Sequence, residues 1–545
     1  MVMKKYTFIL FAASFVMLLC TGCNYEDLNT NPFEMTEEEG VMDGIAVGGL
    51  ITSMQKSVLP VGTQADDTDI INQYQIAYHL SADTWSGYFG QNNSWNNGNN
   101  NTSYYLVDSW ISSTYASSYT NVLDSWKKLK ANAEANNTPE VFALAQILKI
   151  SAWHKTLESF GPMPYLHADA ATLNIPFDSE KDIYKAMFEE LSAAVEVLTA
   201  KAENGISIMS AYDAVYAGDA TKWVKYANSL MLRLAVRVRF ADSELAKTYA
   251  LKAVGHSIGV MTSKDDEAKM GVGAGMVFRN NIEWLSEQYN ETRMGTSIYS
   301  YLMGYNDPRL SAYFKPVGEG SSYGTVANDG EKYQAVPQGH TYGQNTTYEA
   351  FSKPNITSGT PTYWLRASEV YFLRAEAALV WGASFGSDSD LYQQGIEMSF
   401  QENGITSSVA SYMGSSLKPA AQSIRGVYSY EFAAPTEATA KYSGTTEQKL
   451  EKIMIQKWIA LYPNGQEAWT EWRRTGYPKL NPVLVNRGQS NGVNDASKGV
   501  RRMVYPISFY QSSDGQAVYD EALKLFNNGN GGEDLASTRL WWDCR

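Results

Sequence analysis

The sequence predicts a mainly α-helical protein, built from tetratricopeptide-like helix pairs with long irregular loops. Apolar residues recur at helical spacing in many separate stretches, so most of the chain is expected to be helical. The small residues Ala367, Ala375 and Ala378 lie near one face of a predicted helix with Tyr371, which allows a second helix to approach closely. No period of about 34 residues carries a complete repeat signature, so the expected repeats are degenerate.

The best-marked predicted helix covers residues 179–200. Ser179 and Asp182 have capping-box-like spacing, and Met187, Leu191 and Leu198 repeat on one helical face. This pattern is typical of an amphipathic helix packed on one side. Similar patterns predict helices over residues 36–57, 138–160, 220–240, 243–254, 362–381, 390–403, 447–461 and 520–527.

Two long blocks, residues 89–113 and 317–361, lack helical periodicity and are rich in Asn, Gly, Ser, Thr and Tyr. Loops of this length in a compact protein are usually functional or disordered. Their aromatic content argues against simple disorder. We therefore expect a single α-helical domain over residues 36–545, with ligand-binding loops at about 89–113 and 317–361.

The first residues have the pattern of an export signal. Two lysines precede an apolar run at residues 8–19 that is too short to span a bilayer comfortably, and two small residues precede Cys23. The stretch resembles the lipobox of bacterial lipoproteins, although Cys20 stands where that pattern usually has Leu. We expect a signal peptide over residues 1–22, acylation of Cys23, and a lipidated polar tether over 23–35. The alternative is an ordinary secretory signal with a chance cysteine.

Net charge and cysteine content limit the binding partners and the cross-links that this protein can have. The formal net charge is −14, which argues against nucleic acid or an anionic membrane surface. The acidic residues after Cys23 resemble the surface-export signal of lipoproteins in glycan-degrading Gram-negative bacteria, which implies an outer-membrane protein facing the cell exterior. Cys544 has no partner for an intramolecular disulfide once Cys20 is removed and Cys23 is acylated. No later apolar run is long enough to span a membrane, so the lipid is the expected attachment.

A family resemblance begins at Asp213. The run D-A-V-Y-A-G-D-A-T-K-W-V-K-Y-A-N-S-L-M-L-R-L-A-V-R-V resembles one typical of the SusD/RagB family, in its SusD-like subgroup. Further resemblances follow in order, at residues 160–165, 307–310 (D-P-R-L), 368–377, 395–400, 456–458, 467–478, 501–506 and 539–543 (R-L-W-W-D). They cover essentially the whole chain.

Most of these motifs are expected to be scaffold. Trp223, Trp469 and Trp541 are predicted to lie in the core. Arg473 and Arg474 are predicted to bind helix carboxyl ends or acidic partners.

The resemblance implies a non-enzymatic receptor that captures oligosaccharides and acts as the lid of a SusC-type TonB-dependent outer-membrane transporter. Sugars present C–H faces that suit aromatic rings and hydroxyls that suit amides. Residues 90–105 supply both, so this block is the leading predicted ligand loop. Its expected contact residues are Trp95, Asn96, Tyr104 and Tyr105, with Trp85 and Trp110 beside them. The alternative is that Trp85, Trp110 and Tyr105 only fasten the loop to the body. A second predicted group consists of Trp284, Tyr289, Arg293 and Tyr342.

Enzyme and metal signatures are weak. Residues 320–324 match G-x-S-x-G, but their flanks are polar loop rather than the strand and helix of a nucleophile elbow. The five histidines have no metal-ligand spacing, so no metal or other cofactor is expected. Residues 66–69 offer acidic groups for calcium, although a solvated loop or helix cap explains them better. Two rivals remain: an oligopeptide-binding lid of the same kind, and a surface glycoside hydrolase, whose paired acids are recognised only in space.

Overall fold

The computed structural model describes residues 45–61, 69–172, 174–273, 277–317, 332–341, 348–424 and 429–545. Within these ranges helices predominate and strands are short, which confirms the mainly α fold class. The α-helices are α4 (Ile45–Val58), α5 (Asp69–Tyr74), α6 (Asp108–Tyr115), α7 (Asn121–Asn136), α8 (Pro139–Phe160), α9 (Glu180–Glu203), α10 (Ala220–Val238), α11 (Ser243–Val254), α12 (Asn281–Glu287), α13 (Thr296–Gly304), α14 (Leu310–Tyr313), α15 (Ala367–Trp381), α16 (Asp388–Glu402), α17 (Val409–Gly414), α18 (Thr446–Leu461), α19 (Gly465–Thr475), α20 (Ser513–Lys524) and α21 (Phe526–Gly529). The strands are β1 (Phe89–Gln91), β2 (Ala268–Met270), β3 (Thr292–Met294), β4 (Thr362–Leu365), β5 (Gln422–Ile424) and β6 (Tyr430–Phe432).

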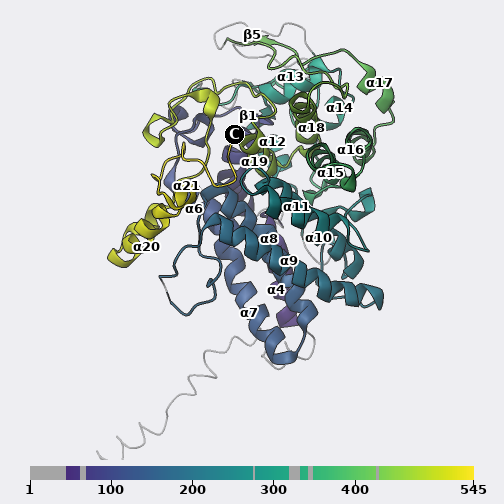
Figure 1. Ribbon diagram of the computed structural model, residues 1–545. Coiled ribbons are helices and arrows are strands. Elements are labelled where there is room, and N and C mark those ends of the chain that lie inside the picture. The colour runs from purple at the N-terminus through teal and green to yellow at the C-terminus, as the bar shows by residue number, and fades with distance from the viewer. Residues whose placement is uncertain are drawn as a thin grey trace, which may run out of the picture. The chain divides into compact units, whose positions relative to one another are not determined.

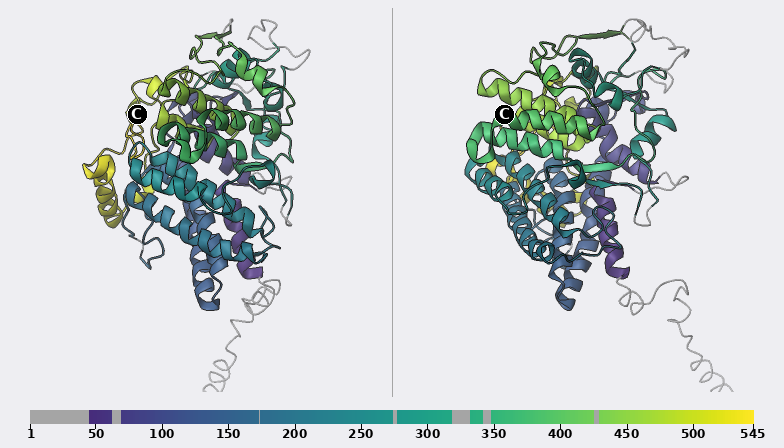
Figure 2. Two further views of the ribbon diagram at one scale, coloured as in Figure 1. Left: turned by 45° about the vertical axis from the view of Figure 1, so that its right-hand side comes forward. Right: turned by 90° about the vertical axis from the view of Figure 1, so that its right-hand side faces the viewer.

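Neighbouring helices pack side by side in succession. Helix α7 contacts α8, α8 contacts α9, α9 contacts α10, and α10 contacts α11 (Figure 1 and Figure 2). Helix α15 packs on both α16 and α18. A short turn joins α7 to α8: α7 ends before left-handed Asn137, and Pro139 opens α8. This succession is the tetratricopeptide-like arrangement that the small residues and helical periods predicted.

Small residues set the spacing of the helix pair α15 and α16. Ala367 and Ala375 are fully buried in α15. A Cβ atom added at Gly395 of α16 would lie 2.7 Å from Cε1 of Phe372, so only glycine fits there without displacing the ring. The predicted close approach on this face of α15 is therefore present.

The predicted cap of α9 is confirmed. The Ser179 hydroxyl accepts a hydrogen bond from the backbone N–H of Asp182 at 3.2 Å and donates to the Asp182 carboxylate at 2.6 Å. These bonds satisfy an amide that the first helical turn would otherwise leave unpaired. Met187 and Leu191 are fully buried on the expected face.

The strands form three two-stranded antiparallel sheets, β1–β3, β2–β4 and β5–β6. In the first, Phe89 pairs with Met294 and Gln91 with Thr292. A Cβ atom at Gly90 would lie 2.2 Å from the carbonyl oxygen of Val336, so this glycine lets a third segment lie against β1. The small sheets thus fasten loops that are distant in sequence.

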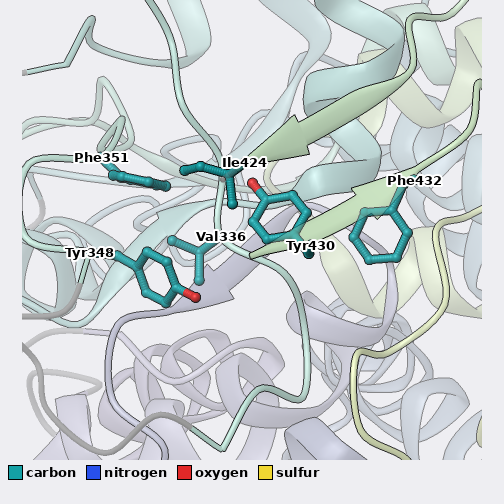
Figure 3. Close-up of a cluster of buried hydrophobic side chains, with 6 residues drawn as sticks. All are labelled: Val336, Tyr348, Phe351, Ile424, Tyr430 and Phe432. Carbon is teal, nitrogen blue, oxygen red and sulfur yellow. The ribbon is translucent and has the colours of Figure 1, made fainter. Parts of the chain in front are cut away.

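A buried apolar cluster anchors the β5–β6 hairpin to these loops. Figure 3 shows Tyr430 and Ile424 of the hairpin facing Val336, with Tyr348 and Phe351 beside them. The Tyr430 hydroxyl also donates to the carbonyl of Ala335 at 2.6 Å. Val336, Tyr348 and Phe351 of the second predicted loop block are therefore packed, although the described residues of that block contain no helix.

Several predicted boundaries need correction. Residues 362–365 form strand β4 rather than the start of a helix, because they pair with β2. Helix α6 begins at Asp108, inside a block predicted to be non-helical, and α20 ends at Lys524, before two left-handed asparagines. The helix predicted over 36–57 is described only from Ile45, as α4. Helices α7 and α19 were not predicted at all.

None of the helices in the described ranges is long and apolar enough to cross a membrane. The signal peptide, Cys23 and the tether lie outside the described residues, as do the G-x-S-x-G stretch and Asp66 and Asp67 of the acidic cluster. The predictions made for them stay predictions.

Candidate ligand-binding site

The structure brings the two predicted ligand groups together. Residues 92–105, hereafter the asparagine loop, follow β1, and residues 288–291 precede β3, to which β1 is paired. The backbone N–H of Asn92 donates to the carbonyl of Glu291 at 2.6 Å, and the Asn92 amide donates to the carbonyl of Asn290 at 3.2 Å. The segments that carry Trp95 and Tyr289, far apart in sequence, are thus joined next to the β1–β3 sheet.

Two of the asparagines hold the loop in shape. The Asn100 amide donates to the carbonyls of Ser94 and Trp95 at 2.8 and 3.0 Å, and its side-chain oxygen accepts from the Thr102 backbone N–H at 2.9 Å. The Asn101 side-chain oxygen accepts from the backbone N–H of Val107 at 2.9 Å. Both residues are fully buried, so this part of the asparagine run is scaffold.

Three asparagines of the loop face outward. Asn96, Asn97 and Asn99 are exposed, and their side-chain amides make no hydrogen bond to any residue that the structure describes. Asn96 and Asn97 have left-handed backbones, with φ of 49° and 53°, which asparagine tolerates better than most residues. Half-buried Trp95 lies beside them. A flat ring next to free amide donors and acceptors is the chemistry that suits a sugar.

Two predicted aromatic contacts, Trp85 and Tyr104, lie deeper than this surface. Trp85 is buried, packs 4.9 Å from the ring of Trp469, and donates its indole N–H to the carbonyl of Asn101 at 2.8 Å. Tyr104 is also buried, with φ of 70°; a Cβ atom at Gly488 would meet its Cβ at 2.8 Å. Trp110 is half-buried in α6. Trp85 and Tyr104 therefore fasten the loop to the body, whereas Tyr105 is 42% exposed.

The second predicted group, Trp284, Tyr289, Arg293 and Tyr342, also contains both partly exposed and buried residues. Tyr289 is half-buried, and its hydroxyl donates to the Asn72 side chain at 3.0 Å. Trp284 is half-buried beneath the Arg279 guanidinium, which lies 4.2 Å from its ring centre. Tyr342 lies outside the described residues. Of this group, Tyr289 is nearest in sequence to the contacts with the asparagine loop.

Arg293 is a positioning residue in the interior. It is fully buried and donates to the carbonyls of Tyr348, Thr292 and Glu349 at 3.2, 2.9 and 2.9 Å. Burial lowers the pKa of its guanidinium to about 10. Its donors are used within the protein, so it braces the backbone around β3.

Glu291 was missed by the sequence prediction. Its carboxylate accepts from the Gln75 amide at 2.6 Å and from the Asn93 amide at 3.3 Å, and so it connects the asparagine loop to the π-helix η1 (Gln75–Asp83). Burial raises its pKa to about 7. The only sequence signal was an acidic residue in the polar run just before Arg293.

One constellation resembles catalytic geometry but lies in the interior. His79 Nε2 is 2.8 Å from Thr292 Oγ1, and His79 Nδ1 is 3.1 Å from Asp83 Oδ2, which is the order of a nucleophile, base and acid. All three residues are at most 2% exposed, and Asp83 also accepts from the Tyr74 hydroxyl at 2.7 Å. This line of bonds fastens β3 to η1 and offers a substrate no access.

A second interior cluster has metal-ligand chemistry. Ligand atoms of His154, Glu158 and Glu467 lie within 4.8 Å of one another. The Arg237 guanidinium already donates to both carboxylates, at 3.0 Å for Glu158, and Lys155 and Arg233 add positive charge beside His154. Burial and these cations hold the pKa of His154 well below its ordinary value. The arrangement is a buried ion-pair network, since a dication would meet the same cations.

The model of one protein family, described as "Susd and RagB outer membrane lipoprotein", matches residues 27–543 of this chain. The chain belongs to the SusD/RagB family. No curated protein sequence matches it.

Solved SusD homologues share the fold. A chitin-binding SusD homologue from Flavobacterium johnsoniae is 32% identical, with a TM-score of 0.82 over 92% of this chain and 99% of its own. A SusD homologue from Bacteroides ovatus is 31% identical, with a TM-score of 0.81 over 92% and 100%. One from Bacteroides vulgatus is 30% identical, with a TM-score of 0.82 over 92% and 99%.

The run at Asp213 that resembles the family is a hub of hydrogen bonds. The buried Asp213 carboxylate accepts from the Trp223 indole at 2.7 Å, from the Gln55 amide at 2.7 Å and from the backbone N–H of Gly218 at 2.8 Å. Further along the run, the Arg233 guanidinium binds both oxygens of Glu369 at 2.7 Å. The SusD/RagB run thus joins α4, α10 and α15 in the core.

The predicted scaffold roles of other motif residues are confirmed in all but one case. Arg473 donates to the carbonyl of Glu158 near the carboxyl end of α8 at 2.6 Å, and Arg474 binds both oxygens of Glu376 at 2.6 and 2.7 Å. Trp223 and Trp469 are fully buried. Trp541 is a correction: it is half-buried, and its neighbour Trp542 is the buried indole.

Proposed function

We propose that this member of the SusD/RagB family binds glycans at the cell surface and serves as the substrate-capturing lid of a SusC-type TonB-dependent outer-membrane transporter. The observation that carries the proposal is half-buried Trp95, followed within four residues by Asn96, Asn97 and Asn99, whose exposed amides bond to none of the described residues. Similarity to a chitin-binding homologue supports a carbohydrate ligand. The lipid on Cys23 would hold the protein at the outer membrane, facing the exterior.

The protein acts by binding and makes or breaks no bond of its ligand. The asparagine loop contains neither Asp nor Glu, so it cannot supply the pair of acids that a glycosidase needs. Glu291 is hydrogen-bonded to Gln75 and Asn93 and connects the loop to η1. The exposed amides next to Trp95 are uncharged, which matches neutral oligosaccharides better than charged peptides.

A titration of the purified protein against oligosaccharides and oligopeptides tests this function. Calorimetry with chitin, cellulose, maltose and mannan oligosaccharides should give saturable heats for at least one glycan, and the glycan should be recovered intact. If peptides bound saturably and no glycan bound, the result would favour an oligopeptide-binding lid instead. Release of shorter sugars would select the glycoside hydrolase.

Membrane attachment through Cys23 and the role in glycan uptake are tested separately in cells. Cys23→Ala should release a folded, ligand-competent protein that no longer supports glycan uptake, because the anchor would be lost while the fold is intact. Unchanged uptake in that variant would contradict the lid. A Cys544→Ala variant, which leaves Cys23 in place, should remain attached and active.

A further inference from the structure

A hollow lies where the start of α9, the segment after α10 and the C-terminal segment meet. Its volume is about 640 Å³, within the roughly 300–1,000 Å³ typical of small-molecule sites. No residue of the asparagine loop or of residues 288–293 lines it. Its lining includes Lys181, Phe240, Asn527, Asn528, Trp541 and Cys544.

Two aromatic rings line this hollow and are held in place. The backbone N–H of Trp541 donates to the Glu180 carboxyl at 2.9 Å, and its ring lies 6.0 Å from that of Tyr184. Its indole N–H makes no hydrogen bond to a described residue. The Phe240 ring is covered by the Arg239 guanidinium, 3.7 Å from its centre. A fixed, half-buried indole with an unused donor can both stack on a ligand and hydrogen-bond to it.

Free amides stand beside these rings. Asn527 and Asn528 lie in the short element α21 after α20, and their consecutive backbones are left-handed, with φ of 54° and 56°. Both are exposed, and their side-chain amides bond to no described residue. The hollow therefore repeats the chemistry of the asparagine loop, an indole beside paired asparagines, on different elements.

The charges of the hollow favour a neutral ligand. The Lys181 ammonium lies 3.5 Å from the Asp242 carboxylate, which partly offsets its charge. Glu180 is buried, and burial raises its pKa to about 8, so at pH 7 it is mostly uncharged. A neutral molecule with an apolar face and several hydroxyls meets these groups best.

We propose that this hollow is a second carbohydrate-binding site, separate from the asparagine loop, which takes one or two sugar rings. It goes beyond the proposed function, which requires the loop alone. Trp541 would stack on a sugar face, and the amides of Asn527 and Asn528 would bind its hydroxyls. A long glycan could then be held at two places on one protein, which slows its loss.

Protection of Cys544 from alkylation tests the site directly, because this exposed thiol lines the hollow. The full chain is treated with iodoacetamide with and without chitobiose, cellobiose or maltose, and mass spectrometry reads the labelling of Cys544 alone. We expect at least one disaccharide to slow labelling severalfold in the wild type and in Trp95→Ala. Trp541→Ala should lose the protection, and Trp541→Phe should retain part of it.

A matched control is Trp381→Ala, which removes another half-buried indole that does not line the hollow. It should keep full protection, and thermal unfolding confirms that each variant is folded. If no disaccharide slowed labelling of Cys544 although the protein still bound glycan through Trp95, the second site would be overturned. The proposed function would then still stand. Absence of any glycan binding would overturn both.

Discussion

The helical body and the asparagine loop use polar residues in opposite ways. In the body, Arg237 is fully buried and pairs with Glu158, Glu467 and Glu471, so its charge is used within the protein. In the loop, Asn100 is fully buried and bonded, while the side chain of Asn99 beside it is exposed and bonds to none of the residues that the structure describes. Buried polar groups define the fold and exposed ones are left for a ligand, so residue type alone does not reveal function.

The largest effect should come from breaking the ion-pair network of the body. Arg237→Met would leave three buried carboxylates without their shared partner, which costs about 3–5 kcal/mol of the free energy of unfolding. Urea denaturation measures it. The control Lys128→Met removes an exposed ion pair with Asp124 and should cost less than about 1 kcal/mol. Equal effects would mean that the network does not support the core.

Displacement of β1 should affect both regions. In Gly90→Ala the new methyl group would meet the Val336 carbonyl at 2.2 Å, so we expect a loss of about 1–3 kcal/mol in unfolding free energy. Glycan affinity should fall as well, because β1 leads into the asparagine loop. Gly359→Ala, where a Cβ has no neighbour within 4 Å, is the matched control. If Gly90→Ala bound glycan with normal affinity, the glycan-binding conformation of the asparagine loop would not depend on the position of β1.

Substitutions at the adjacent residues Asn99 and Asn100 test whether exposed and buried asparagines of the loop have different roles. Asn100→Ala removes the bonds to Ser94, Trp95 and Thr102, and should lower stability by about 1–3 kcal/mol. Asn99→Ala should leave stability unchanged and weaken glycan binding only. Thermal unfolding and calorimetry on both variants measure the two effects. If the two variants behaved alike, the division into scaffold and contact asparagines would be wrong.

A smaller, pH-dependent effect is expected at Glu291. Its pKa is raised from 4.5 to about 7 in the folded protein, so folding favours the protonated form. Its contribution to stability is complete below pH 4.5 and is lost as the pH rises through about 7. Glu291→Gln mimics the protonated form and should be more stable than wild type at pH 8, by on the order of 1 kcal/mol. Urea titrations at pH 4 and pH 8 should show the difference only at the higher pH.

Much of the fold follows from sequence patterns, because helical periods and caps are local. Ser179 and the small residues of α15 were assigned correctly for this reason. Strand β4 was mistaken for a helix because its pairing with β2 is a distant contact. Trp541 and Trp542 are chemically alike, and only the packing around them decides which one is buried.

The candidate site was predictable in its chemistry but not in its geometry. The asparagine-rich run marks the loop, yet the sequence cannot separate Trp85 and Tyr104, which fasten it, from Trp95, which lies near its surface. Burial of Arg293 and the bonds of Glu291 depend on the pairing of β1 with β3. These contacts join residues roughly 200 positions apart, so they appear only once the chain is folded.

The most direct test of the central claim is a crystal structure of the protein with a glycan that binds in calorimetry. The account predicts a sugar ring stacked on Trp95, with its hydroxyls bonded to the amides of Asn96, Asn97 or Asn99. A glycan bound only elsewhere, with the asparagine loop unoccupied and Trp95→Ala binding normally, would contradict it.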